Sequence, residues 1–539
     1  MNFLRLHDDL LSVLFEDDDI IAIDKPYGFD AHTNDSKHAH GEAIKDGLIE
    51  IYEKNRNQKL HIIHRLDKTT TGVMIFGKSL AAAKVYKDFF LNRQVDKEYW
   101  FITQKEHSKK NLLVEQPIVH KAKELDAKTE MNWVRTQDGF QVWRAHPFSG
   151  RNHQIRIHAQ VAGLSLLGDE KYEGAPYPFL CLHNHQMLFP NGIKIQSRLP
   201  GYFEDLKLLK NRPLVQVIFE VDRRQRLFPV DSGRPPCVRL VNHVMGDRGG
   251  GPGYNLDQMG PRWILYWLKE EWTAVDEQLW ADVGQYFRRD ILVHHASGKK
   301  IIGTNSAIVE LAKPPMTLDG PEKTMHPCTW LVSEGRIQSE LRGDVNGSCG
   351  LYLNQRLQRQ WLLRNASQKS VLNVFSYTGG YAVAAAMGGA FKLTSVDSNK
   401  NNLAWSKQNF AINELDMGPE TVFLCRDSIT FMEGAVAKRQ QFDIVVCDVP
   451  TFFRREKGVF RIEKDFEKLL LLCLRVLADE GTLLLSTAYD GFYIDDLRRK
   501  IMNAEKGLEL SLILPSLDFE WPEQKANLKS FLIRRNHHA

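Results

Sequence analysis

Five short apolar runs, separated by stretches whose apolar residues recur at helical spacing, shape the last third of the chain. They lie at residues 371–375, 391–396, 421–425, 442–447 and 482–486. Strands that are buried on both faces form continuous apolar runs, and strands that alternate with helices form parallel sheets. From about residue 350, the sequence therefore predicts a doubly wound, mainly parallel α/β sheet of the Rossmann-like kind.

The first part of the chain, residues 11–222, has a mixed pattern that predicts an α+β domain. Short strands are expected at Val13–Phe15 and Ile20–Ile23, on either side of an acidic turn. Apolar residues at helical spacing predict a helix from Ser79 to Asn92, and an alternating stretch predicts a strand at Tyr99–Ile102.

A chain of 539 residues has room for about three domains. The α+β pattern breaks near Val221, and the polar stretches 223–226 and 231–236 predict a linker. The middle of the chain predicts a small α+β central domain, with a loop at 249–253 and a strand at 263–267. The expected domains are 1–222, 223–345 and 346–539.

Composition and charge favour a soluble cytoplasmic protein. The longest apolar run, 469–477, is interrupted by Arg475 and is far too short to span a membrane. An acidic start, without an apolar segment after it, does not resemble a signal peptide. The seven cysteines include no C-x-x-C pair, which indicates buried thiols in a reducing compartment rather than disulfides or a zinc site.

The net charge of +4 does not by itself indicate a nucleic-acid-binding protein. A surface that binds RNA would have to come from the arrangement of the 71 Lys and Arg residues. Three basic stretches are candidate phosphate contacts: 54–59, 105–110 and 223–226. A solvated surface is the simpler interpretation of each stretch taken alone.

One carboxylate, Asp67, follows an arginine in the sequence His64-Arg65-Leu66-Asp67, between two apolar runs. A lone Arg-Leu-Asp triplet is usually a surface turn or an ion pair. Here further elements accompany it in a fixed order: Lys25-Pro26, Lys97-Glu98-Tyr99, Gly150-Arg151-Asn152-His153-Gln154-Ile155-Arg156-Ile157-His158, Leu167-Gly168-Asp169, Tyr172 and Leu182-His183. With these elements, residues 10–205 resemble RNA pseudouridine synthases of the RluA type.

That resemblance implies a uridine isomerase that needs no cofactor. Asp67 would be the catalytic base or nucleophile, and Arg156 would pair with it. Tyr99 would pack on the target base, while Arg65 would enter the gap left when the uridine flips out of its stack. Asn152 stands where the family has threonine, which is a small departure.

Four histidines, His64, His153, His158 and His183, lie within these motifs. They are expected to be core or RNA-contact residues rather than zinc ligands, because no cysteine or carboxylate joins them at ligand spacing. No metal site is expected in the chain.

The second group of motifs lies around the predicted parallel sheet. A glycine pair, Gly379-Gly380, follows the first strand, where a loop that approaches a cofactor needs glycine. Asp397 ends the next strand, 18 residues after Gly379, where an acidic residue can accept hydrogen bonds from ribose hydroxyls. Asp427 follows the third strand and would lie at an adenine. Such a sheet could equally bind NAD or a nucleotide, but the chain has no G-x-G-x-x-G motif.

The turn after the fourth strand, Asp448-Val449-Pro450-Thr451-Phe452, favours a methyltransferase that uses S-adenosylmethionine (SAM). With 350–356 and 255–263, it is similar to ribosomal RNA large-subunit methyltransferases of the RlmI and RlmK type, over about residues 240–535. The resemblance implies Asp448 as a catalytic residue. It also implies a set of SAM-binding residues: Gln355, Arg356, Phe375, Tyr377, Thr378, Gly379, Asp397, Asp427 and Asp448.

The residues after the fifth strand bear on which atom is methylated. Carbon-5 of cytosine needs a cysteine thiolate for activation, but residues 484–492 contain no cysteine, and Cys447 is expected to be a buried packing thiol. A ring nitrogen needs only positioning, so the leading acceptor is N7 of guanine, by resemblance to RlmK. Val449 and Asn354 depart from the family's proline and aspartate, and Val449 is expected either to loosen the turn or to fill the same space.

These motifs predict a bifunctional enzyme that modifies RNA, expected to be 23S-type ribosomal RNA of the large subunit. One alternative is a monofunctional pseudouridine synthase, acting on ribosomal or transfer RNA, whose C-terminal half binds RNA or SAM without efficient methyl transfer. Another is an RNA-folding or assembly factor. The sequence leaves open the target nucleotides, the order and coupling of the two reactions, and the oligomeric state.

Overall fold

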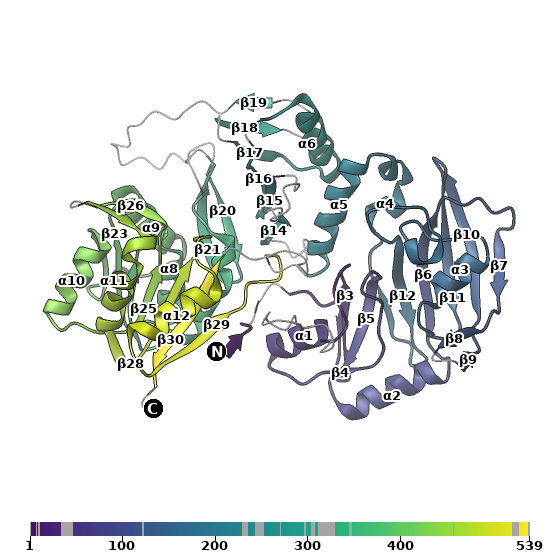
Figure 1. Cartoon of the computed structure of the whole chain (residues 1–539), viewed down its shortest axis with the longest axis horizontal. Coiled ribbons are helices and arrows are strands. Elements are labelled where there is room, and N and C mark those ends of the chain that lie inside the picture. Colours follow the sequence, from purple (N-terminus) through teal and green to yellow (C-terminus); the bar gives the residue numbers. More distant parts are fainter. Residues whose placement is uncertain are drawn as a thin grey trace.

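The computed structural model describes residues 2–6, 8, 11–33, 47–120, 123–228, 236–242, 253–269, 271–295, 298–302, 308–310, 329–343, 348–455, 458–519 and 528–536. Most of the predicted linker 231–236 and of the predicted loop 249–253 lies outside these residues. The chain forms three parts: an N-terminal α+β part, a small central part and a C-terminal α/β part (Figure 1). Within the described residues, no helix is long and apolar enough to cross a membrane.

The N-terminal part is built on a ten-stranded sheet. Its main path runs, in spatial order, through β2 (Phe15–Glu16), β3 (Ile20–Lys25), β5 (Thr71–Gly77), β12 (Leu182–Leu188), β6 (Asp96–Thr103), β11 (Phe140–Pro147), β10 (Thr129–Gln137) and β7 (Asn111–Val114). Two short strands, β4 (His61–Ile62) and β13 (Lys194–Gln196), pair with β5 and β12. A separate hairpin joins β8 (Ile118–His120) and β9 (Lys123–Leu125). The α+β prediction is confirmed for this part.

Most local predictions for the N-terminal part are confirmed. The predicted helix is α2 (Leu80–Leu91), which begins after Ser79, whose side chain accepts a hydrogen bond from the backbone of Ala82 and so caps the helix. The predicted strand at Val13–Phe15 is mostly wrong, because only Phe15 enters β2, where it pairs with Ala22. The other helices are α1 (Leu48–Arg56), α3 (Gln154–Val161) and α4 (Gly201–Glu204), with short 3-10 turns at Glu170–Tyr172 and Leu206–Lys210.

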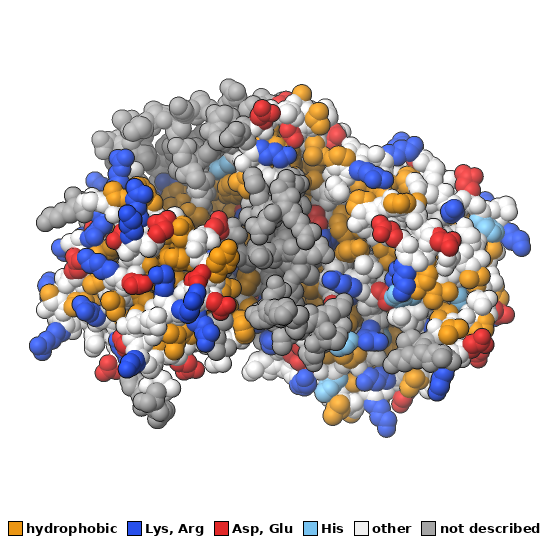
Figure 2. Space-filling model, viewed as in Figure 1, with side chains coloured by type: hydrophobic (Ala, Val, Ile, Leu, Met, Phe, Trp, Pro, Cys, Tyr) orange, Lys and Arg blue, Asp and Glu red, His pale blue; other side chains and the backbone are white. Residues whose placement is uncertain are grey.

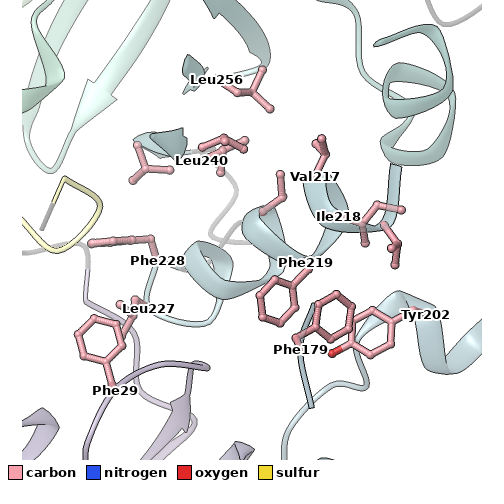
Figure 3. Packing of buried hydrophobic residues seen from close by; sticks show 14 of the residues in the cluster. Phe29, Phe179, Tyr202, Val217, Ile218, Phe219, Leu227, Phe228, Leu240 and Leu256 are labelled. Atoms are coloured by element: carbon pink, nitrogen blue, oxygen red, sulfur yellow. The ribbon is translucent and has the colours of Figure 1, made fainter. Parts of the chain in front are cut away.

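Helix α5 (Arg212–Gln225) joins the N-terminal part to the central part. The side chain of Asn211 caps its first turn by accepting from the backbone of Leu214, and Pro213 lies in that turn. Phe219 on α5 stacks on Phe179, with ring centroids 4.0 Å apart, and Tyr202 lies beside this pair. Figure 3 shows Val217, on the same helix, on the side of Leu240 and Leu256 in the central strands. One apolar core therefore continues from the first part into the second.

The predicted linker at 223–226 is wrong. Helix α5 extends through Gln225, so the predicted domain boundary between residues 222 and 223 falls inside a helix. Arg224 and Arg226 are fully or almost fully buried, with 0% and 1% of their surface exposed. Arg226 donates to Asp24 and Asp222 at 2.7 Å, while Arg224 pairs with Glu220 one turn back. Buried arginines require such partners, and these make the helix end a structural junction.

The central part consists of a six-stranded sheet covered by helix α6 (Ala274–Phe287). Its strands, in spatial order, are β14 (Cys237–Asn242), β15 (Tyr254–Met259), β16 (Arg262–Trp267), β17 (Ile291–His295), β18 (Gly298–Ile302) and β19 (Ile308–Glu310). The strand predicted at 263–267 is β16. A two-stranded hairpin, β20 (Thr329–Glu334) and β21 (Ile337–Arg342), follows toward the C-terminal part.

The C-terminal part contains an eight-stranded sheet in which five of the seven strand pairs are parallel. In spatial order the strands are β1 (Asn2–Leu4), β29 (Leu508–Ile513), β30 (Lys529–Arg535), β28 (Leu477–Thr487), β25 (Phe442–Asp448), β22 (Ser370–Val374), β23 (Lys392–Asp397) and β24 (Thr421–Cys425). Its helices are α7 (Arg356–Asn365), α8 (Gly380–Met387), α9 (Lys400–Ile412), α10 (Ser428–Ala437), α11 (Ile462–Arg475) and α12 (Ile494–Ala504). A hairpin of β26 (Phe452–Arg454) and β27 (Val459–Arg461) follows β25. All five predicted strands and the predicted parallel sheet are confirmed.

Strand β1 was not predicted, and it pairs outside the N-terminal sheet. Its residues Asn2 and Leu4 pair in parallel with Ser511 and Ile513 of β29, so the beginning of the described chain forms the edge of the C-terminal sheet. The predicted domain 1–222 is therefore not contiguous in space. Figure 1 shows this strand at the N-terminus, at the edge of the C-terminal part.

A buried ion-pair cluster fixes this arrangement. Arg356, at the start of α7, donates to Asp518 at 2.7 Å and to Asp8 at 3.1 Å. It also donates to the backbone oxygen of Cys237 in β14 at 2.9 Å. The Arg356 cluster (Arg356, Asp8, Asp518 and the Cys237 carbonyl) thus links the N-terminal segment, the central sheet and the C-terminal part.

Candidate active sites

The first candidate site is organised around the turn that follows β4 and carries Asp67. Lys25, at the end of β3, is fully buried, and its Nζ donates to the backbone oxygens of Lys68 at 3.0 Å and Thr70 at 2.9 Å. A third bond goes to the oxygen of Pro26, so all three hydrogens of an ammonium group have an acceptor. Burial lowers the pKa of Lys25 to about 7. Lys25 therefore holds the backbone of the Asp67 turn from the interior.

Helix α3 brings Arg156 to this turn. The Arg156 Nη1 lies 3.5 Å from Asp67 Oδ2, so the predicted pair is present, although it is long. The tighter partner is Asp169, whose two carboxylate oxygens each accept from Arg156 at 2.7 Å. Such a bidentate pair fixes the plane of the guanidinium. The sequence analysis named Asp169 within a motif but missed this role.

His153 is a second neighbour of Asp67 that the sequence analysis did not assign. Its Nε2 lies 3.6 Å from Asp67 Oδ2, and its Nδ1 is 2.8 Å from the hydroxyl of Tyr172. The residue has a φ of 55°, a left-handed conformation that only a few per cent of non-glycine residues adopt. Burial lowers the pKa of His153, although the charge of Asp67 opposes this shift.

Tyr99 and Arg65 complete the first site. Tyr99 lies half-buried on β6, and burial, followed by the nearby charge of Asp67, raises the pKa of its hydroxyl. Arg65 is exposed, and no hydrogen bond or ion pair joins its side chain to the described residues. The fold thus gathers Asp67, Tyr99 and Arg156, with a free guanidinium two residues before Asp67.

The remaining histidines of these motifs are core residues. His64 accepts from the backbone of Ile75 at 3.1 Å and stacks on Phe90, and burial lowers its pKa to about 3. His158 and His183 are fully buried and hydrogen-bonded to threonine hydroxyls at 2.8 Å. Among the described residues, no group of three His, Cys, Asp or Glu side chains is placed to hold a metal ion.

The second candidate site begins at the loop between β22 and α8. Three of its residues have left-handed backbone conformations: Phe375, Tyr377 and Gly379, with φ of 54°, 48° and 80°. A Cβ at position 379 would lie 1.9 Å from the Ser406 hydroxyl, so glycine is required both by φ and by the packing of the loop on α9. Non-glycine residues in this region store strain, which concentrates at functional sites.

Asp397, at the end of β23, stabilises that loop. One of its carboxylate oxygens accepts from the backbone of Tyr377 and the other from the backbone of Asn399, each at 2.8 Å. Burial raises the pKa of Asp397, against the effect of these bonds. A carboxylate has about four acceptor positions, so Asp397 can still accept a further hydroxyl.

Asp427 is the cap of helix α10. It accepts from the backbone and hydroxyl of Thr430, at 2.7 and 2.9 Å, and it pairs with Arg455 at 3.2 Å. Burial raises the pKa of Asp427, but these hydrogen bonds outweigh it and hold the pKa below its usual value. Its contact with an adenine stays a prediction.

Asp448 ends β25, and its side chain faces Gln355, which directly precedes α7. The Gln355 amide donates to Asp448 Oδ2 at 2.5 Å. Burial raises the pKa of Asp448 to about 6, although the bond from Gln355 opposes this shift. A carboxyl group with this pKa changes its charge close to neutral pH, which is typical of functional sites.

The turn after Asp448 is tied to the sheet through its unusual residue. Val449 is buried, and its backbone N–H donates to the oxygen of Ser486 in β28 at 2.8 Å. Proline has no N–H and could not make this bond. The effect of Val449 on methyl transfer stays a prediction.

Arg356 does not contribute to this site as expected. Every hydrogen bond that the structure gives its guanidinium goes to the Arg356 cluster, and the side chain is fully buried. The expectation that Arg356 binds the cofactor is therefore corrected to a structural role. Its neighbour Gln355, on the same turn, contacts Asp448.

The residues around the loop 375–379 fit an adenosyl group in their chemistry. The hydroxyls of Ser376 and Ser406 are buried and have no hydrogen-bond partner among the described residues. Buried polar groups are normally paired, so these hydroxyls suit a polar ligand. Together with Asp397, they are donors and acceptors that could hold the ribose and the polar end of SAM.

The basic stretches that were predicted to contact phosphate differ in their exposure. Lys105, Lys109 and Lys110 are exposed and remain candidate phosphate contacts, whereas 223–226 are excluded by their burial and ion pairs. Figure 2 shows Lys and Arg side chains interspersed with Asp and Glu over the visible face.

Cys447 is buried as expected, but Cys425 is exposed, against the prediction of buried thiols.

Two family models match separate parts of the chain. Residues 19–161 match the RNA pseudouridylate synthase family, and residues 323–509 match a family of S-adenosylmethionine-dependent methyltransferases. The chain therefore combines a domain of an isomerase family with a domain of a transferase family, as the motifs predicted. The matches do not include the central sheet.

Curated relatives match part of the chain. A ribosomal RNA large subunit methyltransferase K/L from Pseudoalteromonas translucida is 37% identical over 150 residues, which are 28% of this chain and 21% of that protein. A ribosomal RNA large subunit methyltransferase I from Klebsiella pneumoniae is 29% identical over 268 residues, 48% of this chain and 62% of the relative. This chain thus spans less than two thirds of either relative.

Solved structures also match parts of the chain. The structure of SMU.776 complexed with SAH is 25% identical and covers 66% of this chain and 88% of its own, with a TM-score of 0.49. Human RNA Pseudouridylate Synthase Domain Containing 4 is 25% identical over 37% of this chain and 93% of its own, with a TM-score of 0.31.

Proposed function

We propose that this chain is a bifunctional RNA-modifying enzyme, which isomerises uridine to pseudouridine in its N-terminal part and methylates a base with SAM in its C-terminal part. The observation that carries the proposal is the pairing of the two family matches with two separate carboxylate sites. Asp67 lies within the first match, and Asp448 lies within the second. Each carboxylate has its own set of buried partners.

For the isomerisation, the bond from ribose C1′ to uracil N1 breaks and a bond from C1′ to C5 forms. The proton lost from C5 balances the proton gained at N1, so no other reactant is consumed. Asp67 acts as a nucleophile or as a general base at the ribose or the uracil. Arg156, whose guanidinium plane is fixed by Asp169, orients the Asp67 carboxylate. Tyr99, with its raised pKa, stays a neutral phenol that can pack on the uracil.

Arg65 has the freedom that the flipping step requires. Extruding a base from a stack costs a few kcal/mol. A planar guanidinium can stack in the gap and so offset part of that cost. Because Arg65 is exposed and has no partner among the described residues, no existing ion pair has to break first.

For the methyl transfer, SAM supplies the methyl group as an electrophile. The strained loop 375–379 and Asp397 would hold its adenosyl part at the carboxyl ends of the parallel strands, where such sheets bind ligands. Asp448, at the end of β25, and Gln355, directly before α7, are hydrogen-bonded to each other and would orient the acceptor base. Within residues 484–492 there is no cysteine to activate a pyrimidine carbon, so a ring nitrogen is favoured.

The substrate that best fits the chain is large-subunit ribosomal RNA of the 23S type. The two curated relatives described above are named as enzymes of large-subunit ribosomal RNA. N7 of guanine is the leading acceptor, because it is nucleophilic without deprotonation. A shared substrate also gives a reason for the fusion, since tethering raises the effective concentration of the second site near the first target.

The test is mass spectrometry of the RNA products. The purified chain is incubated with unmodified large-subunit RNA fragments, with and without methyl-labelled SAM. We expect pseudouridine under both conditions and a methylated guanine only when SAM is present. Pseudouridine without any methylated base would reduce the C-terminal part to RNA or SAM binding. The absence of both products would overturn the proposal.

A further inference from the structure

A cavity of about 380 Å³ lies between the N-terminal part and the central part, and none of the candidate catalytic residues lines it. Its walls come from both parts. Asp24 and Arg198 belong to the N-terminal part, whereas Gln258, Trp263, Phe287 and Arg289 belong to the central part. Ligand cavities of this size are large enough for a small molecule or a single nucleotide.

One wall carries a buried acceptor without a partner. Gln258, on β15, is 1% exposed, and its Oε1 has no hydrogen-bond partner within the part of the chain that the structure describes. Leaving such an acceptor unpaired in the interior costs free energy unless a ligand donates to it. Gln258 therefore suits a ligand that presents an N–H or O–H group.

A second wall is cationic. The side chain of Arg198 is 51% exposed and makes only long contacts of 3.3 Å, to Gln225 and Asp222. Arg289 is half-buried, and its side chain makes no hydrogen bond or ion pair with the described residues. These two guanidinium groups can bind an anion, and phosphate matches their planar fork.

Two other charged groups in the cavity are already neutralised. Arg226 donates to Asp24 and Asp222, and Asp24 also accepts from Ser197 at 2.8 Å. One guanidinium faces two carboxylates here, and Arg198, 3.3 Å from Asp222, balances the second carboxylate. The positive charge left over for a ligand is that of Arg289, and the half-exposed Arg198 offers further N–H donors.

The remaining walls are apolar and aromatic. Phe287, at the end of α6, is half-buried, and its ring centroid lies 4.8 Å from that of the buried Trp263. An aromatic side chain beside a hydrogen-bond acceptor and two arginines suits a ligand with a planar ring, a ring donor and a phosphate. The four common nucleotides have this combination, because each base carries an N–H donor.

We propose that this junction cavity binds one nucleotide, with its base against Phe287, a base N–H donating to Gln258 and its phosphate at Arg198 and Arg289. The nucleotide is either part of the substrate RNA or a free nucleoside monophosphate. This inference rests on the proposed action on RNA, because the cavity lies between the part that carries Asp67 and the central part that leads to the methyltransferase part. The cavity would then fix the path of the RNA between the two reactions.

Two substitutions in the full-length chain test the proposal. Arg289→Glu reverses the charge at a half-buried position, and Gln258→Met removes the acceptor while keeping the length of the side chain. Arg288→Glu is the matched control, because Arg288 is exposed and is not among the residues that line the cavity. Thermal unfolding shows which variants are folded, and either folded variant suffices for the test.

Binding is measured without turnover, in an Asp67→Asn background and without SAM, so that the result does not depend on either activity. The probes are the four nucleoside 5′-monophosphates and a fluorescent single-stranded RNA. We expect the affinity for one class of probe to fall by at least about tenfold in both variants, as for the loss of a charge-assisted contact, and not in Arg288→Glu.

The pattern of losses identifies the source of the nucleotide. Weaker binding of a monophosphate supports a free nucleotide, and weaker binding of RNA alone supports a nucleotide of the substrate. If folded Arg289→Glu and Gln258→Met bind every probe like the parent chain, the proposal is overturned. The product analysis described above tests the proposed function separately, so the two failures are distinguishable.

Discussion

Arg156 donates to both carboxylate oxygens of Asp169, at 2.7 Å each, and reaches Asp67 with its remaining Nη1 at 3.5 Å. Asp169 is 1% exposed, so the plane of the guanidinium is set from the interior. The orientation of the candidate catalytic carboxylate thus depends on a residue that does not contact the substrate site itself.

We expect Asp169→Asn to slow pseudouridine formation by about 10- to 100-fold, as when a catalytic group loses its orientation, with little effect on methylation. The reason is that Asn offers one acceptor, which leaves half of the bidentate pair unmade. Single-turnover kinetics should show the loss in the chemical step rather than in RNA binding. Glu170→Gln is the control, and Asp169→Glu should restore part of the rate. An equal loss in RNA affinity would contradict a positioning role.

The two active sites should fail independently. Asp67→Asn is expected to abolish pseudouridine formation and to leave methylation intact, because Asp448 and Asp397 lie in a different sheet. Quantitative mass spectrometry of both products in one reaction checks this.

Asp397→Ala is the reciprocal variant. It should weaken SAM binding measured by calorimetry and preserve pseudouridine formation, whereas Asp416→Ala, at an exposed position, should change neither. Loss of both products in either active-site variant would mean that the sites are not separate.

The rate of methyl transfer should fall below about pH 6. Burial raises the pKa of Asp448 to about 6, so its carboxyl group is protonated and uncharged on the acid side of that value. Gln355→Met removes an N–H that favours the ionised form, so it should move the acid limb to higher pH. A pH profile of single-turnover methylation measures the acid limb of the parent chain and that of Gln355→Met. Identical acid limbs in these two proteins would contradict this assignment.

Protonation of Asp448 would not produce such an acid limb by unfolding the chain. Its pKa in the folded chain lies above the ordinary value of 3.8, so the folded state binds this proton more tightly. The contribution to stability is therefore fully present below about pH 4 and is lost as the pH rises through 6. Circular dichroism across pH 5–7 provides the control.

Arg356→Met should destabilise the whole chain. It would leave the buried carboxylates of Asp8 and Asp518 without their cation, and breaking a buried ion pair in this way costs about 3–5 kcal/mol. Thermal or urea unfolding measures the effect. Arg499→Met, at a side chain that is 73% exposed, should change the free energy of unfolding by less than about 1 kcal/mol. If both variants unfolded alike, the Arg356 cluster would have no special role.

Val449→Pro should not improve methylation, although proline is the residue expected from the family resemblance. The substitution removes the N–H that bonds Ser486 and leaves that buried carbonyl oxygen unpaired, which costs about 1–3 kcal/mol. We expect a lower melting temperature and an equal or lower rate of methylation. Val449→Ala keeps the N–H and serves as the control. A faster Val449→Pro enzyme would show that valine weakens the turn.

The sequence predicted the C-terminal sheet well because each strand carries its own signal. Strands buried on both faces need apolar residues throughout, so 371–375 and 442–447 could be recognised without knowing their neighbours. The same holds for α2, where a capping serine and helical spacing coincide.

The failures have a common physical cause, which is that the decisive partner lies elsewhere. Arg223–Arg226 look like a polar linker until Glu220, Asp222 and Asp24 are seen to neutralise them. Arg356 follows the cofactor-loop pattern, yet its partners are 348 and 162 residues away. The left-handed Phe375 and Tyr377 carry no local signal, because strain of this kind is imposed by the surrounding fold.

The pairing of β1 with β29 has a consequence for how the molecule is made. The ribosome synthesises residues 2–4 some five hundred residues before their partners at 511–513. Domains generally fold as they emerge, so the uridine-isomerising part can mature while this short strand stays unpaired. The strand closes the edge of the methyltransferase sheet only at the end of translation. An affinity tag fused before residue 2 would therefore disturb the half of the enzyme that is encoded last.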